Sequence, residues 1–190
     1  MPGKIAALIL SLFLLTGPAG AARFADTDIP DSIRLEGTDS ELILNGGGIR
    51  EKLFMDIYIG ALYLPEKTTS AGAILSATGP ASVHMHFLYK EVSREKIIDS
   101  WHDGLSANLA SPEYTALQPR LEQFNSLFRS VRSGEIISID YIPGTGTAVR
   151  INAELQGTVP GNDFFRALLK IWLGDRPVSK SLKQGMLGNR

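Results

Sequence analysis

The chain has 190 residues, of which 44% are hydrophobic and 21% are charged, and it contains no cysteine. This composition is typical of a globular protein with one apolar core, and the length fits a single domain. The 19 Lys and Arg residues nearly balance the 20 Asp and Glu residues, so the formal net charge is -1. That balance argues against a nucleic-acid partner bound through its phosphates. The lack of cysteine excludes disulfides, thiol nucleophiles, iron–sulfur clusters and cysteine-bound zinc.

Residues 1–22 have the pattern of a secretory signal peptide. Lys4 provides a positive charge, residues 5–15 form a nearly uninterrupted apolar run, and four small residues follow at 19–22. The apolar run is too short to span a membrane, which needs about 20 residues. The alternative is an uncleaved N-terminal anchor. We therefore expect one mature domain over residues 23–190, periplasmic or secreted, without stable membrane insertion after the signal is cleaved.

Strands are predicted in two groups from short apolar runs between turn signals and, at residues 83–89, from the alternation of apolar and polar residues. The first group lies at residues 33–36, 41–44, 53–64 and 83–89, and the second lies at 135–141, 147–151 and 154–159. The connections within the second group are short enough for an antiparallel meander. Three glycines at 46–48 indicate unusual backbone angles or a close approach to another segment.

Helices are expected where apolar residues recur at helical spacing between start and stop signals. The first covers residues 68–78, and the second covers 93–109 with Ser93 as its cap. A third is expected to open at Pro119, and a fourth is expected to start with Asn162 as its cap. Strands joined by short turns, with helices in a block between them, indicate an α+β fold. We predict a large antiparallel sheet with a layer of helices on one face.

The histidines do not form a complete metal site in the sequence. His84 and His86 point to the same face of one predicted strand, but no carboxylate or third histidine lies nearby. Two ligands are too few for zinc. We expect both to be polar residues on the solvent face of the sheet. His102 lies opposite the apolar stripe of its helix, where we expect it to be solvated.

Two short motifs resemble catalytic or phosphate-binding patterns but lack the rest of those patterns. Ser93 and Lys96 match the S-x-x-K of penicillin-recognising enzymes, yet the S-D-N and K-T-G partners are absent and helix capping explains Ser93. The segments 46–48 and 144–147 are rich in glycine but lack the spacing of a phosphate loop, so we expect turns there.

Arg50 is a candidate ligand-binding residue. It follows three glycines and precedes a long apolar strand that carries Tyr58 and Tyr63. A guanidinium against an apolar wall needs an anionic partner, because an unpaired buried charge is costly. It can bind a carboxylate or phenolate through two hydrogen bonds, and a tyrosine hydroxyl can add a third. The alternatives are a salt bridge to Glu51, Asp56 or another acid, or simple exposure.

Several segments in a fixed order resemble the chalcone isomerase-like superfamily, most closely its branch of exported bacterial proteins. They are LNGGGIR at 44–50, IYIGALYLP at 57–65, FL at 87–88, YIPGTGT at 141–147, GNDFF at 161–165 and ALLKIWLGD at 167–175. Together they span about residues 33–187. The resemblance implies an open-faced β-sandwich, in which a large antiparallel sheet and a layer of helices enclose an apolar cleft.

The resemblance implies two alternative chemistries. Plant members cyclise a chalcone to a flavanone by intramolecular oxa-Michael addition, whereas plant relatives without that activity bind fatty acids through an Arg and a Tyr. Arg50 falls where the superfamily keeps its cleft arginine. The strand Thr of the isomerases falls on Tyr58, their catalytic Tyr and helix-start Asn fall near Val92 and Asp99, and their late-helix Thr falls on Ile171.

These departures favour binding over catalysis. They remove polar groups that would hold a water network and stabilise a developing enolate, whereas Arg50 and Tyr58 suffice to hold a carboxylate. We therefore predict a non-catalytic protein that binds a small apolar carboxylate, similar to a fatty acid, without a cofactor or metal. The alternatives are a chalcone-type isomerase acting on a phenolic enone and a protein-interaction scaffold. Phe54 and Trp172 are bulky enough to fill the expected cleft.

Overall fold

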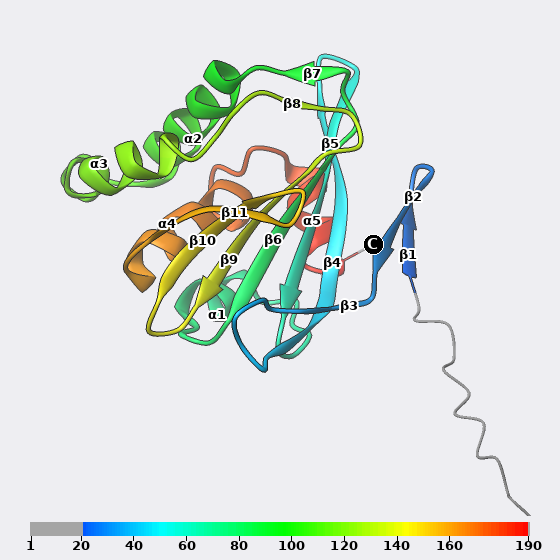
Figure 1. Cartoon of the computed structure of the whole chain (residues 1–190), viewed down its shortest axis with the longest axis horizontal. Helices are drawn as coiled ribbons and strands as arrows, with labels where there is room; N and C mark the ends of the chain where they lie inside the picture. Colours follow the sequence, from blue (N-terminus) through cyan, green and yellow to red (C-terminus); the bar gives the residue numbers. More distant parts are fainter. Residues whose placement is uncertain (1–20, 190) are drawn as a thin grey trace, which may run out of the picture.

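The computed structural model describes residues 21–189, and a seven-stranded antiparallel sheet forms its centre (Figure 1). In spatial order, the strands are β11 (Glu154–Val159), β10 (Gly146–Ile151), β9 (Ile136–Ile142), β6 (Ala81–Phe87), β5 (Met55–Leu64), β4 (Glu41–Lys52) and β3 (Ser32–Arg34). The meander expected near the C-terminus is present as β9, β10 and β11. β6 pairs with both β5 and β9, and so joins the two predicted groups of strands into one sheet.

Helices pack on one face of this sheet. They are α1 (Ala71–Ser76), α2 (Arg94–Asn108), α3 (Ser111–Asn125), α4 (Asn162–Leu173) and α5 (Lys180–Met186). Alternate residues of β6, such as Val83 and Met85, share one core with helix residues such as Trp101 and Trp172. The predicted α+β class, with a large antiparallel sheet and helices on one face, is confirmed. No helix within residues 21–189 is both long enough and apolar enough to cross a membrane.

The opposite face of the sheet is partly covered by the N-terminal segment of the described chain. β1 (Ala21–Phe24) and β2 (Thr27–Pro30) form a separate hairpin, which the sequence patterns did not predict. Ile29 packs with Ile59 and Tyr63 in a second, smaller core, and the Tyr63 hydroxyl donates to the Pro30 carbonyl at 3.0 Å. Residues 1–20, most of the predicted signal peptide, lie outside the described residues.

Several expected boundaries were wrong for local reasons. Pro119 lies inside α3, which starts at Ser111, and the proline in the first turn is Pro112. The cap of α4 is Gly161, whose φ of +100° suits glycine, and Asn162 is the first helical residue.

Two other local predictions are confirmed. A turn was expected at Gly144 and is present, with φ of +80° between β9 and β10. The predicted cap of α2 is also confirmed, because Ser93 accepts a hydrogen bond from the Lys96 amide.

The three glycines at 46–48 form no turn but lie within β4, against α5. A Cβ at Gly46 would overlap the carbonyl oxygen of Gly185, and a Cβ at Gly48 would touch Leu182. The expected close approach is therefore confirmed, since these glycines let the backbone of α5 lie directly on the strand. A short ribbon, β7 (Glu91–Val92) paired with β8 (Val131–Arg132), completes the described structure.

Candidate functional site

Arg50 and Tyr58 lie directly opposite each other on the neighbouring strands β4 and β5. Side chains of directly opposite residues in an antiparallel pair leave the sheet on the same face, with Cβ atoms about 5 Å apart. Tyr58 belongs to the core shared with the helices, so the pair lies on the helix-covered face. The register of one hairpin therefore brings together the two residues that the sequence indicated as ligand-binding.

Tyr58 is buried, with 7% of its surface exposed, and its hydroxyl accepts a hydrogen bond from Trp172 Nε1 of α4 at 3.0 Å. Burial raises the pKa of Tyr58 to about 12, although the bond from Trp172 and the charge of Arg50 both act to lower it. The phenol is therefore neutral near pH 7. Among the described residues, no group accepts the Tyr58 hydroxyl hydrogen, which leaves it able to donate to a ligand.

The Arg50 guanidinium donates to the backbone carbonyl of Glu51. Within residues 21–189 it forms no ion pair, so the expected alternative of a salt bridge to Glu51 or Asp56 is not observed. A half-buried cation without a carboxylate partner retains its full attraction for an anion.

A small cavity of about 80 Å³ lies against Arg50 and Tyr58. Its walls are mostly apolar and come from strands β4, β5, β6 and β7 and from helices α2 and α4. The lining residues are Arg50, Lys52, Ile57, Tyr58, Met85, Phe87, Val92, Ile97, Ser100, Trp101, Ile171 and Val178. The charged residues among them, Arg50 and Lys52, are both cations, so this inner cavity favours an anion.

The inner cavity adjoins an outer cleft of about 380 Å³, with which it shares Lys52, Ile57, Val92 and Ser100. The outer cleft lies between the end of the β4–β5 hairpin and α2, and Asp99 lines it. The five positions suggested by the sequence therefore line two adjoining hollows, together called the cleft. Arg50, Tyr58, Val92 and Ile171 line the inner part, and Asp99 lines the outer part.

The sequence reasoning missed Lys52 and the donor role of Trp172. Lys52 lies two residues after Arg50 in the same strand, a spacing that places side chains on one face, so this cation was detectable.

Neither of the two bulky residues, Phe54 and Trp172, fills the cleft. Phe54 is fully exposed at the tip of the β4–β5 hairpin, and Trp172 lies behind Tyr58, with its ring centroid 5.9 Å from that of Trp101.

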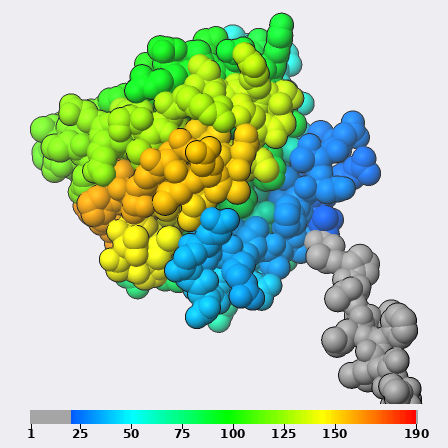
Figure 2. Space-filling view, viewed as in Figure 1, coloured from blue at the N-terminus to red at the C-terminus, as the bar shows by residue number. Residues whose placement is uncertain are grey.

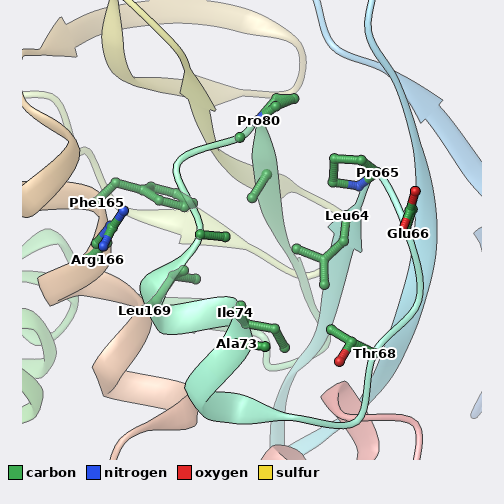
Figure 3. Close-up of a pocket in the computed structure, with 13 residues that line it drawn as sticks. Leu64, Pro65, Glu66, Thr68, Ala73, Ile74, Pro80, Phe165, Arg166 and Leu169 are labelled. Carbon is green, nitrogen blue, oxygen red and sulfur yellow. The ribbon is translucent and has the colours of Figure 1, made fainter.

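A second hollow, of about 220 Å³, lies between α1, α4 and the end of β5 (Figure 3). Phe165, Leu169 and Ile74 give it an apolar wall, but none of the predicted site residues lines it. Its charged lining residues are Arg166 and Glu66, which lie on opposite sides of the hollow in Figure 3. Because these charges are of opposite sign, this hollow has no net preference for an anion, and the cleft at Arg50 is the stronger candidate.

The far face of the sheet carries a buried polar cluster of Ser82, His84, Asp140 and Arg150. Ser82 Oγ donates to Asp140 Oδ1 at 2.5 Å, and Arg150 Nε lies 3.5 Å from Asp140 Oδ2. Arg150 Nη1 also lies 3.2 Å from Glu36 Oε2. Burial raises the pKa of Asp140, against the lowering effects of Ser82 and Arg150. Ser82 is hydrogen-bonded to Asp140, and the charge of Arg150 is balanced by two carboxylates, although its Nε forms no hydrogen bond within residues 21–189. Such mutual charge pairing is typical of a structural network.

The expected solvent exposure of the histidines was wrong. His84 and His86 do share the face opposite the helices, but both are largely buried there, and His84 Nε2 lies 4.0 Å from Asp140 Oδ1. Burial, aided by His86, lowers the pKa of His84 to about 4. His102 is also bound rather than solvated, because its ring nitrogens contact Tyr114 Oη at 2.8 Å and Asn125 Nδ2 at 3.0 Å.

Metal ligation is not evident in the part of the chain that the structure describes. No group of three or more His, Cys, Asp or Glu side chains there could hold a metal ion. The inner cavity offers two cations, a neutral phenol and an apolar wall. The outer cleft is more polar, because Glu91, Asp99 and Asp103 line it together with Lys52 and Lys96.

Comparisons with known proteins agree with this architecture. The model of the chalcone isomerase-like family matches residues 21–188. Among solved structures, a fatty-acid binding protein of Arabidopsis thaliana aligns with a TM-score of 0.66 and 16% sequence identity. That alignment covers 83% of this chain and 96% of the other, and at this identity it shows a shared fold. No curated protein matches the sequence.

Proposed function

Because the chain belongs to the chalcone isomerase-like family, we propose that it is a non-catalytic protein that binds a small apolar carboxylate, similar to a fatty acid. The observation that carries this proposal is the Arg50–Tyr58 pair in the mostly apolar inner cavity. One residue offers an unneutralised cation, and the other offers a free hydroxyl hydrogen. The Arabidopsis structure of the same fold is that of a protein named for fatty-acid binding, which supports the choice of ligand class.

The shape of the cleft supports a defined orientation of the ligand. The inner cavity of about 80 Å³ is much smaller than the roughly 300–1,000 Å³ of ordinary ligand pockets, so it suits a head group and the first few carbons. The carboxylate then accepts hydrogen bonds from Arg50 and Tyr58, with Lys52 nearby. The chain extends past Ile57 and Val92 into the outer cleft of about 380 Å³.

The location of the protein is part of the proposal. We infer that residues 1–22 direct export and that the domain acts in the periplasm or outside the cell, as a member of an exported bacterial branch of the family. The support is the charge, apolar run and small residues of that segment. Sequencing the N-terminus of the protein recovered from its native compartment tests this inference, and an intact Met1 would contradict it.

A native mass spectrum of the purified protein, followed by organic extraction, tests whether a carboxylate is bound. Titration with a fluorescent fatty acid then compares three variants. Arg50→Gln is expected to weaken binding by about tenfold or more, because hydrogen bonds to charged groups contribute about 1.5–3 kcal/mol. Tyr58→Phe is expected to weaken it several-fold. Arg166→Gln, which changes the cation of the second hollow, is the matched control and should leave the affinity unchanged.

Unchanged affinity in Arg50→Gln would contradict the proposal. An empty protein that accelerates chalcone cyclisation above the spontaneous rate, and loses this activity in Arg50→Gln, would instead support the isomerase alternative. An empty, inactive protein that captures a specific partner would support the scaffold alternative.

A further inference from the structure

The turn between β4 and β5 combines two unfavourable features. Lys52 pairs with Met55, so Leu53 and Phe54 form a two-residue turn, and both have positive φ, +51° and +65°. This backbone is that of a type I′ turn, which strongly favours Asn-Gly because side chains rarely adopt positive φ. The large apolar side chains are also presented to water, with Phe54 fully exposed, Leu53 78% exposed and Met55 38% exposed.

A second two-residue turn of the chain has nearly the same backbone angles but smaller residues. Asn152 and Ala153, between β10 and β11, have nearly the same angles, +53° and +69°. Asn152 is suited to this backbone, and its side chain accepts from the Ile136 amide and donates to Glu135, each at 2.9 Å. The same backbone is therefore formed with Asn-Ala, a small pair with one polar member, at one hairpin and with Leu-Phe at the other. At this turn, Leu-Phe is unfavourable both because of its positive φ angles and because its apolar side chains are exposed to water. Residues that are locally unfavourable in this way indicate a functional site.

The position of this apolar tip indicates its role. Lys52, Leu53 and Met55 also line the outer cleft, so the tip borders the entrance to the candidate ligand site. The β4–β5 hairpin reaches the end of the molecule beside β7 (Figure 1). The space-filling view shows part of the same end as cyan atoms at the margin of the green segments, which partly cover them (Figure 2). A surface that receives the tip would face the cleft entrance.

We propose that the tip formed by Leu53, Phe54 and Met55 inserts into a lipid bilayer and holds the cleft entrance against it. Three side chains on a convex turn cannot supply the roughly 800 Å² per partner of a stable protein interface, but they can enter the region between headgroups and acyl chains. The neighbouring charges, Glu51, Lys52 and Asp56, include no excess of cations. Docking is therefore apolar and does not depend on anionic lipids. Exchange of the ligand with the bilayer rests on the proposed function, whereas docking rests on the tip alone.

Sedimentation with phosphatidylcholine vesicles tests the docking, with the same N-terminus in every variant. The double variant Leu53→Asn/Phe54→Gly gives the turn its preferred residues, so we expect it to be at least as stable as the parent to urea. It should also bind vesicles about tenfold less tightly, because it removes most of the exposed apolar surface of the tip. Leu155→Asn, at an exposed leucine on β11, is the control for a general loss of surface hydrophobicity and should bind as the parent does.

Three results would overturn the docking proposal. The first is a parent protein that does not bind the vesicles, and the second is a double variant that binds them equally well. The third is binding that needs phosphatidylglycerol and disappears at high salt, which would make the contact electrostatic. Self-association removed by the double variant, without vesicle binding, would show that the tip contacts a second copy of the chain. Arg50→Gln separates the two proposals, because it should lose the fatty acid and still bind vesicles.

Discussion

Arg50 and Arg150 lie on opposite faces of the same sheet. Among the described residues, only Arg150 has carboxylate partners. On the far face, Arg150 lies close to the carboxylates of Asp140 and Glu36. On the helix-covered face, Arg50 contacts a backbone carbonyl and borders a cavity whose other charged residue, Lys52, is also a cation. A cation that is neutralised by the chain belongs to the structure, whereas a cation without such a partner is available to a ligand.

The neighbours of the two arginines differ in the same way. Asp140 is only 4% exposed, and it accepts a hydrogen bond from Ser82 and lies beside the guanidinium of Arg150. These partners offset the cost of burying its charge. Tyr58, in contrast, accepts one hydrogen bond from Trp172, and none of the described residues accepts its own hydroxyl hydrogen. We therefore expect substitutions on the far face to change stability, and substitutions at the cleft to change binding with smaller effects on stability.

The largest expected effect is that of Asp140→Ala. It leaves Arg150 without its buried partner and Ser82 without its acceptor, and we expect a loss of about 3–5 kcal/mol in the free energy of unfolding, measured by urea denaturation. Asp163→Ala breaks the exposed ion pair with Arg120 and is the control, with an expected loss of up to about 1 kcal/mol. Equal losses in the two variants would mean that the far-face cluster is not a structural network.

The second effect is a loss of stability in acid that depends on His84. Its pKa is about 4 in the folded protein and 6.5 in the unfolded chain, so the unfolded state binds the extra proton between these values. The contribution of neutral His84 to the free energy of unfolding is fully present above pH 6.5, and it falls by about 2–3 kcal/mol as the pH drops to 4. Protonation of Asp140, whose pKa is raised, opposes this loss at the acid end. Urea denaturation of His84→Gln across this range should show a flatter pH profile, and an unchanged profile would contradict the assignment.

Tyr58→Phe should have a smaller effect on stability. It removes the acceptor for Trp172 Nε1, and a buried N–H without a partner costs about 1–2 kcal/mol. Tyr63→Phe removes a comparable bond, to Pro30, on the other face. Both variants should unfold at somewhat lower urea concentrations, but only Tyr58→Phe should weaken the fatty-acid titration. Weaker binding in both would show that the effect is a general loss of stability.

Arg50→Gln should have the smallest effect on stability, within about 0.5 kcal/mol of the parent, because no acid among residues 21–189 would be left unpaired. Urea denaturation measures this directly beside Arg150→Gln, which should cost several times more. If Arg50→Gln were as destabilising as Arg150→Gln, Arg50 would be a structural residue and the comparison between the faces would fail.

The sequence by itself determined the main elements of the sheet and its helices. Apolar runs between turn signals marked the strands β5, β9, β10 and β11 and alternation marked β6. Apolar residues at helical spacing marked α2 and α4, because burying one side of a helix requires a fixed spacing. The resemblance that places Arg50 in a cleft depends on short segments and their order along the chain. Arg50 and Tyr58 are eight positions apart, and a hairpin register makes them neighbours.

Only the tertiary structure decided which polar groups satisfy one another. Ser82 and Asp140 are 58 residues apart, and Tyr58 and Trp172 are 114 residues apart, so no local pattern links them. The exposure of His84 and His86 was mispredicted for the same reason, since alternation along a strand defines a face but not what covers it. The N-terminal hairpin, Glu36 and Arg150 lie on that face through long-range packing. The sequence pattern therefore specified local geometry, whereas the neutralisation of each charge depended on contacts between distant segments.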